Sequence, residues 1–256
     1  MPGKDVITRQ PVWGTAQVRD PQGSGFTRKI SKQSLADQVA RTLRDMILTG
    51  EVNPDRQITQ SWVAQLLDVS TMPVREALLR LDGEGFLIAA PSRSFTVRRI
   101  TEDDIRDIYW MHAVLAGELT RRACVRCDES LMETLRAIEA EFVVAWRRGD
   151  RGEMDAANWR FHREINRAAE APKLWLLLHA TLRYIPSGFY ALVPAWADES
   201  ERGHSAILQA FESGKPELAR SEAETHARAA GELLISSFWA SDRWSTDGWS
   251  ANGVGT

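Results

Sequence analysis

The sequence predicts a mainly α-helical protein made of an N-terminal winged helix-turn-helix domain and a C-terminal all-α bundle of six helices. Two observations predict this fold class. Residues 61–87 have the pattern of two short helices, a tight turn and a following strand. Beyond Thr101, apolar residues recur at helical spacing only. We expect a flexible arm over residues 1–30, the winged helix over 31–100, the bundle over 101–239 and a flexible tail over 240–256.

The first helix is expected over residues 34–49, because apolar residues from Leu35 to Ile47 repeat every three or four positions. The second helix is expected over 60–67. It is followed by Asp68 in the turn, where aspartate tolerates a left-handed backbone. The apolar residues of the second helix that should face inward are Val63, Leu66 and Leu67.

The third helix begins after Ser70, a residue type that favours the N-cap position, and carries Pro73 in its first turn. Its buried stripe is expected to consist of Val74, Ala77, Leu78 and Leu81, spaced i, i+3, i+4 and i+7. Two short strands, 86–88 and 95–97, then flank a turn and predict a β-hairpin wing.

The second half of the chain shows helical periodicity throughout. Short loops separate the helices, so neighbouring helices should run antiparallel. The six expected helices cover residues 103–126, 129–148, 151–169, 172–192 with an interruption near Pro186, 197–213 and 216–239.

Charge is unevenly distributed along the chain. Residues 1–100 carry 14 Lys and Arg against 10 Asp and Glu, whereas residues 101–256 carry 18 against 25. A basic front part suits contact with nucleic acid. No apolar run is long enough for a membrane span and the first residues lack a signal peptide's apolar core, so we expect a cytoplasmic protein. Cys124 and Cys127 are expected to be reduced thiols, since two cysteines cannot complete a four-sulfur metal site.

The third helix is the expected DNA-reading element, because a helix of this kind fits the major groove of double-stranded DNA. Arg75 lies on its outer face and is the candidate base reader, since a guanidinium group matches the two acceptors of guanine. Ser70 and Thr71 can reach bases or phosphates at the helix start. The expected phosphate contacts are Arg56, Arg80 and Arg93. The alternative is a winged helix used for protein contacts, without DNA binding.

The segment VAQLLDVSTMPVREALLRLDGEGFL resembles the GntR family of bacterial transcription regulators. The resemblance runs from Leu35 to Val97 and includes the family's PVREAL motif at residues 73–78. It implies that Arg75 contacts a base and that a homodimer, usually a repressor, binds an inverted-repeat operator. Thr71 stands where the family usually has another arginine, so the preferred operator is expected to differ.

Four of the five histidines lie on inward helix faces, on four different helices: His112, His162, His204 and His226. Asn158 and His162 are four residues apart and project from the same helix face. Three imidazoles and one oxygen suit zinc, nickel, cobalt or manganese. The alternative is a set of core histidines hydrogen-bonded to backbone carbonyls.

The helical half resembles the FCD ligand-binding domain of the FadR group, and its six helices resemble the VanR-like branch. The resemblance implies a divalent metal, zinc as first choice, held by His162, His204 and His226, with Asn158 where the family usually has aspartate. It also implies a small carboxylate effector near the metal. His112 stands at the position of an assisting arginine, and Arg183, Tyr184 and Tyr190 are further candidate effector contacts.

The leading hypothesis is therefore a homodimeric, effector-responsive transcription regulator rather than an enzyme. A metal-dependent hydrolase is the alternative from a different class, and it would need a general base near the three histidines. Glu222, one turn from His226, is the candidate base for that reading.

Overall fold

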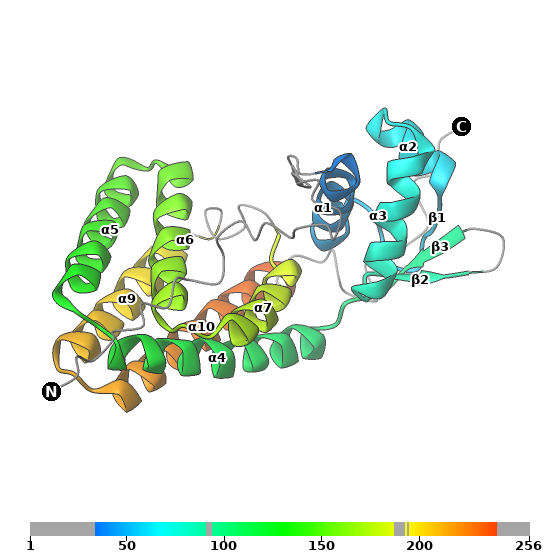
Figure 1. The fold of residues 1–256 in the computed structure, drawn as a ribbon. Coiled ribbons are helices and arrows are strands. Elements are labelled where there is room, and N and C mark those ends of the chain that lie inside the picture. Colours follow the sequence, from blue (N-terminus) through cyan, green and yellow to red (C-terminus); the bar gives the residue numbers. More distant parts are fainter. Residues whose placement is uncertain (1–33, 91–93, 187–192, 194, 240–256) are drawn as a thin grey trace, which may run out of the picture.

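The computed structural model describes residues 34–90, 94–186, 193 and 195–239. Figure 1 shows two regions joined by the start of a long helix: a winged-helix region over residues 34–100 and a helical region from residue 102 onward. The predicted arm and tail lie outside the described residues, as do Arg93 and Tyr190. No helix in the described part of the chain is long and apolar enough to cross a membrane.

The winged-helix region contains three helices and a small antiparallel sheet. The elements are α1 (Leu35–Leu48), β1 (Gln57–Thr59), α2 (Gln60–Leu67), α3 (Thr71–Gly83), β2 (Leu87–Ala89) and β3 (Ser94–Val97). The sheet order is β1-β3-β2, with Ile58 opposite Phe95 and Ile88 opposite Thr96. The wing hairpin and the three helices agree with the sequence-based expectation, whereas strand β1 was not anticipated.

An entirely apolar core holds these helices together. The stripe expected on α3, namely Val74, Ala77, Leu78 and Leu81, is fully buried against α1. The turn between α2 and α3 contains Asp68 with φ 51°, the left-handed conformation expected there. Leu66 was expected to face inward, yet it is 43% exposed. Helix α2 is short, and among its residues only Val63 is fully buried.

The helical region consists of α4 (Glu102–Val125), α5 (Glu129–Arg148), α6 (Arg151–Ala168), α7 (Pro172–Thr181), the 3₁₀ turn η2 (Leu182–Tyr184), α9 (Trp196–Glu212) and α10 (Pro216–Trp239). The long helices α4 and α10 pack along each other, α5 packs on α6, and α9 contacts α5 and α10 (Figure 1). Helix α7 is shorter than the expected 172–192, because the backbone tightens into η2 after Thr181.

The inward face of α10 consists mostly of small side chains on either side of the buried His226. Leu218 is 41% exposed, whereas small side chains such as Ala219, Ala223 and Ala230 are buried. Small residues let α10 approach α4 closely: a Cβ added at Gly231 would lie 2.6 Å from the Tyr109 ring. The close packing of two long helices therefore decides which face of α10 is buried.

Candidate functional site

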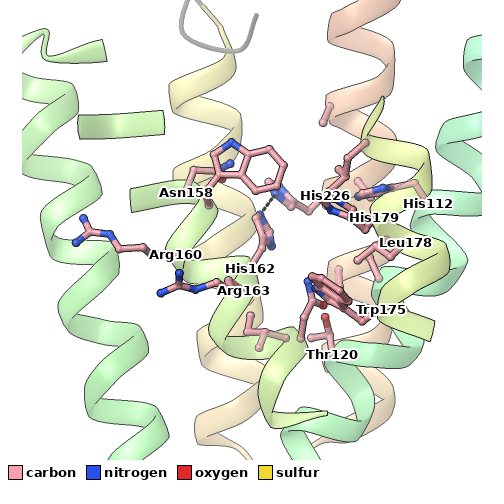
Figure 2. Close-up of a pocket in the computed structure, with 18 of the residues that line it drawn as sticks. His112, Thr120, Asn158, Arg160, His162, Arg163, Trp175, Leu178, His179 and His226 are labelled. Atoms are coloured by element: carbon pink, nitrogen blue, oxygen red, sulfur yellow. Dashed lines mark hydrogen bonds between the residues drawn. The ribbon is translucent and has the colours of Figure 1, made fainter. Parts of the chain in front are cut away.

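Three histidines from three helices meet inside the helical region. His162 on α6, His204 on α9 and His226 on α10 offer ligand nitrogens that all lie within 4.8 Å of one another. The Nε2 atom of His162 lies 3.3 Å from Nε2 of His204. It also lies 3.3 Å from Nε2 of His226, the contact drawn as a dashed line in Figure 2. The convergence expected for these three residues is therefore present in the structure.

Burial keeps these imidazoles neutral. Desolvation lowers the pKa of His204 and of His226 to about 3, and it lowers the pKa of His162 well below its usual value. A neutral imidazole has a free ring nitrogen lone pair, which is the form that binds a metal ion. Protonated rings would repel one another and would also repel a bound cation. The cluster therefore suits a cation when its three rings are neutral.

Glu139 on α5 orients the His204 ring, and sequence reasoning missed it. Its Oε2 atom lies 2.6 Å from His204 Nδ1, so the opposite nitrogen, Nε2, is directed into the cluster. A carboxylate behind a ligand histidine fixes the ring orientation and increases the basicity of the ligand nitrogen. Burial raises the pKa of Glu139 to about 8, so the carboxyl group is mostly protonated at neutral pH, and it would act as a carboxylate once a cation bound at the cluster favours its ionised form. The available signal was a glutamate between Leu135 and Phe142 on the buried face of α5.

Asn158 supplies a buried oxygen beside the cluster. It is 8% exposed and its side-chain Oδ1 atom has no hydrogen-bond partner among the described residues. A buried carbonyl oxygen without a partner is unfavourable unless another group engages it. One turn of α6 separates Asn158 from His162, so both residues face the same cavity. Three neutral imidazoles and a free oxygen fit a divalent cation.

Gly203 allows His226 to reach the cluster. A Cβ at this position of α9 would lie 2.3 Å from His226 Nδ1 and 2.7 Å from its Cγ atom. These distances are too short for any side chain other than hydrogen. Gly203 is therefore a positioning residue for His226. The helical periodicity of the sequence gave no indication of this role.

A cavity of about 530 Å³ opens beside the histidines, between α4, α6, α7 and α10 (Figure 2). His112 lines it, as expected, and its Nδ1 atom lies 2.7 Å from the Thr181 hydroxyl, which donates to the Leu178 carbonyl at 2.6 Å. Thr181 must then accept from His112. Burial lowers the pKa of His112 to about 4, so this residue brings no positive charge for a carboxylate.

Arg183 and Tyr184 do not line this cavity, contrary to the expectation that they contact an effector. The Tyr184 hydroxyl donates to the Glu84 backbone carbonyl at 2.7 Å, and its ring stacks on Phe86 at 4.7 Å. Arg183 pairs with the Glu84 carboxylate at 3.1 Å, and Arg44 pairs with the same carboxylate at 2.5 Å. These two side chains connect the helical region to the end of α3, whereas Leu182, the first residue of η2, lines the cavity.

The candidate DNA-reading residues that the structure describes are all exposed. Arg75, Thr71 and Ser70 are exposed at the start of α3. Arg56 is exposed and lies over the Trp62 ring, 4.5 Å from its centroid. Arg80 forms an ion pair with Asp37, so a phosphate would have to compete with that carboxylate. Stacking and pairing hold both arginines in place without removing them from solvent.

The cavity does not have the composition of a hydrolytic site. No carboxylate is among the described residues that line it, and Glu222, the base considered for hydrolysis, is half-buried away from the lining. Glu222 is therefore not placed to act as the general base that metal-dependent hydrolysis would use.

A DNA-reading winged helix joined to a helical region with a buried binding cavity defines a ligand-responsive transcription regulator. Comparison with known proteins agrees. Residues 35–97 match the family model "Bacterial regulatory proteins, gntR family", and residues 107–229 match the FCD domain. The chain belongs to the GntR family of bacterial transcription regulators and is not an enzyme.

Curated relatives include the "Probable D-xylose utilization operon transcriptional repressor" of Paenarthrobacter nicotinovorans, 30% identical over 80% of this chain and 90% of that protein. The transcriptional regulator McbR of Escherichia coli is 27% identical over 76% of this chain and 90% of its own length. Among solved structures, E. coli McbR/YncC has a TM-score of 0.61 at 21% identity, covering 81% of this chain and all of that one. That likeness supports the fold.

Proposed function

We propose that this regulator is a homodimeric repressor that binds an inverted-repeat operator and releases it when a small organic acid enters the cavity of the helical region. We further propose that a divalent metal ion, zinc as first choice, anchors the acid. The observation that carries the proposal is the convergence of three neutral imidazoles and the unpartnered Asn158 oxygen at one end of a 530 Å³ cavity.

His162, His204, His226 and Asn158 would hold the ion. The metal, when bound, supplies a Lewis acid and a positive charge for a carboxylate. All four protein ligands are neutral, so the full charge of the ion remains to attract an anion. A neutral amide in place of a carboxylate ligand therefore favours acid binding while weakening the hold on the metal.

DNA recognition would use Arg75 on α3, with Ser70 and Thr71 at the helix start and the two positioned arginines 56 and 80 near phosphates. Two such heads in a dimer match two half-sites related by twofold symmetry.

Helix α7 provides a route from the cavity to the DNA-reading head. Its residues Leu178 and His179 line the cavity, and the following turn η2 contacts the C-terminal end of α3 through Tyr184 and Glu84. An acid that shifts α7 changes these contacts directly. The effector thus biases the position of α3 through a continuous structural element.

Native mass spectrometry of the purified chain tests the metal and the dimer together. We expect a dimer mass with one metal ion per chain, and we expect His204→Ala to lose the ion. His179→Ala is the matched control, because His179 lines the same cavity outside the three-histidine cluster. Equal metal content in wild type and His204→Ala would overturn the ligand assignment, and a monomer mass would overturn the dimer.

A further inference from the structure

We propose that the acid recognised by this cavity is a planar aromatic carboxylate rather than a hydroxylated aliphatic acid. This inference rests on the proposed function, because it takes the carboxylate to be held at the histidine cluster. It concerns the remainder of the cavity, which must receive the body of the ligand and so determines its chemical class.

Indole rings from two different helices face the cavity. Trp175 on α7 lines it and remains 43% exposed, and Trp159 on α6 lines it and remains 44% exposed. The Trp175 ring is already stacked on His179, with a centroid distance of 5.3 Å and an interplanar angle of 12°. This stack helps to hold the Trp175 indole in its orientation. Large aromatic surfaces left open to a cavity favour an apolar, flat partner.

The positions of these indoles along their helices connect them to the metal centre. Trp159 precedes His162 by three residues, so the two side chains project from nearly the same face of α6. Trp175, Leu178 and His179 likewise share one face of α7. Figure 2 shows Trp175 and Leu178 from α7 and His162 from α6 around the same space. A ligand held at His162 by its carboxylate therefore places its body beside the indoles.

Short side chains make the adjoining wall flat. Helix α10 contributes Ala223, Ala227 and Ala230 to the cavity lining, and α4 contributes Ala116. Alanine offers neither hydrogen-bond donors nor acceptors and leaves room for a thin, plate-like molecule to lie against the helix backbone. A ring is such a shape, whereas a chain with several hydroxyl groups is not.

Several of the polar side chains that line the cavity already have partners within the protein. His112 is bonded to Thr181. Arg160 pairs with Glu141 at 2.8 Å and with Glu153 at 2.7 Å, and Arg163 pairs with Glu164 at 3.4 Å. Hydroxyl groups placed against the alanines and the indole rings would lose hydrogen bonds to water without replacement, which is unfavourable. An aromatic ring has no such requirement.

Three probes test the inference by isothermal titration calorimetry on the full-length, zinc-loaded protein. Benzoate and cyclohexanecarboxylate carry the same carboxylate on a flat and a puckered six-carbon ring, and D-gluconate carries it on a hydroxylated chain. We expect benzoate to bind roughly three- to tenfold more tightly than cyclohexanecarboxylate, because aromatic contacts add about that factor beyond buried area. Gluconate should bind more weakly than either.

A pair of tryptophan variants assigns the preference to the cavity. Trp175→Leu keeps an apolar side chain but removes the ring, so it should weaken benzoate by roughly three- to tenfold and leave cyclohexanecarboxylate nearly unchanged. Trp110→Leu is the matched control, because Trp110 is 63% exposed on α4 and outside the cavity lining. It should leave the affinity for both acids unchanged.

The outcomes separate this inference from the proposed function. Tighter binding of gluconate or of cyclohexanecarboxylate than of benzoate would overturn the aromatic class while leaving an acid-binding regulator in place. Equal loss of benzoate affinity in the Trp110 and Trp175 variants would overturn the role of the indole. Failure of all three acids to bind zinc-loaded protein would overturn the proposed acid pocket and this inference with it.

Discussion

The winged-helix region carries its candidate functional groups on its surface, whereas the helical region carries them in its interior. In the described part of the chain, every fully buried polar or charged side chain belongs to the helical region, including Glu139, Asn158, His204 and His226. The winged-helix region buries apolar side chains alone and carries Arg75 and Thr71 on its surface. We therefore expect substitutions of candidate functional residues to leave stability nearly unchanged in the winged-helix region and to affect it in the helical region.

The physical reason lies in the kind of ligand that we propose for each region. DNA is large and contacts a surface, so its partners remain solvated until binding and contribute little to folding. A metal ion or a small acid must be enclosed, so its partners are desolvated in the folded protein. The histidine cluster has this property, since burial is the first cause of each lowered histidine pKa.

The largest effect that would sharpen this comparison is expected from Gly203→Ala. The new methyl group would overlap the His226 ring, 2.3 Å from Nδ1, and displace it from the cluster. We expect metal affinity to fall by about 100-fold, measured by competition with a chromogenic chelator. Gly152→Ala is the control, because its new methyl group would meet only Asp150 at 3.7 Å. Equal metal affinity in both variants would show that His226 is not a ligand.

Arg75→Ala tests the other side of the comparison. We expect operator affinity to fall by about 1–3 kcal/mol, while the free energy of unfolding changes by less than about 0.5 kcal/mol, because Arg75 is exposed. Operator affinity is measured by fluorescence anisotropy, with a duplex obtained by in vitro selection. The free energy of unfolding is measured by urea titration. Arg148→Ala, an exposed arginine on α5, should change neither. Salt-independent binding, or no loss in the Arg75 variant, would favour a protein-interaction module.

Glu139→Gln asks whether the buried carboxylate serves the metal site. The amide keeps the size of the side chain but cannot become an anion beside His204, so we expect about tenfold weaker zinc binding. Glu164→Gln is a matched control, because Glu164 is equally buried on α6 but pairs with Arg163 and Arg167. Similar zinc affinities in the two variants would limit Glu139 to a structural role.

The smallest expected effect comes from Tyr184→Phe, at the junction of the two regions. The variant keeps the stack on Phe86 and loses the hydrogen bond to the Glu84 carbonyl, worth about 1 kcal/mol. We expect the acid-induced change in operator affinity to decrease severalfold while metal and acid binding stay as in wild type. An unchanged response to the acid would exclude this contact from the route between the sites.

Local spacing made much of this protein predictable. The stripe Val74–Ala77–Leu78–Leu81 and the Asp68 turn predict α3 and its orientation, because 3.6 residues per turn leave little freedom over one helix. The same rule places Asn158 and His162 on one face of α6. Spacing was insufficient elsewhere: α7 ends at Thr181, short of the expected 172–192, and periodicity did not reveal that Glu139 contacts His204.

The amino-acid sequence by itself determined the helices and the helix-turn-helix, and it supplied the candidate residues for DNA and metal binding, since each of these follows from periodicity and side-chain chemistry. Only the tertiary structure decided which distant residues meet. The pairs Glu139–His204, Gly203–His226 and Tyr184–Glu84 come from different elements. The reason is physical: contacts within one helix follow from its geometry, whereas contacts between helices depend on how all their side chains pack together.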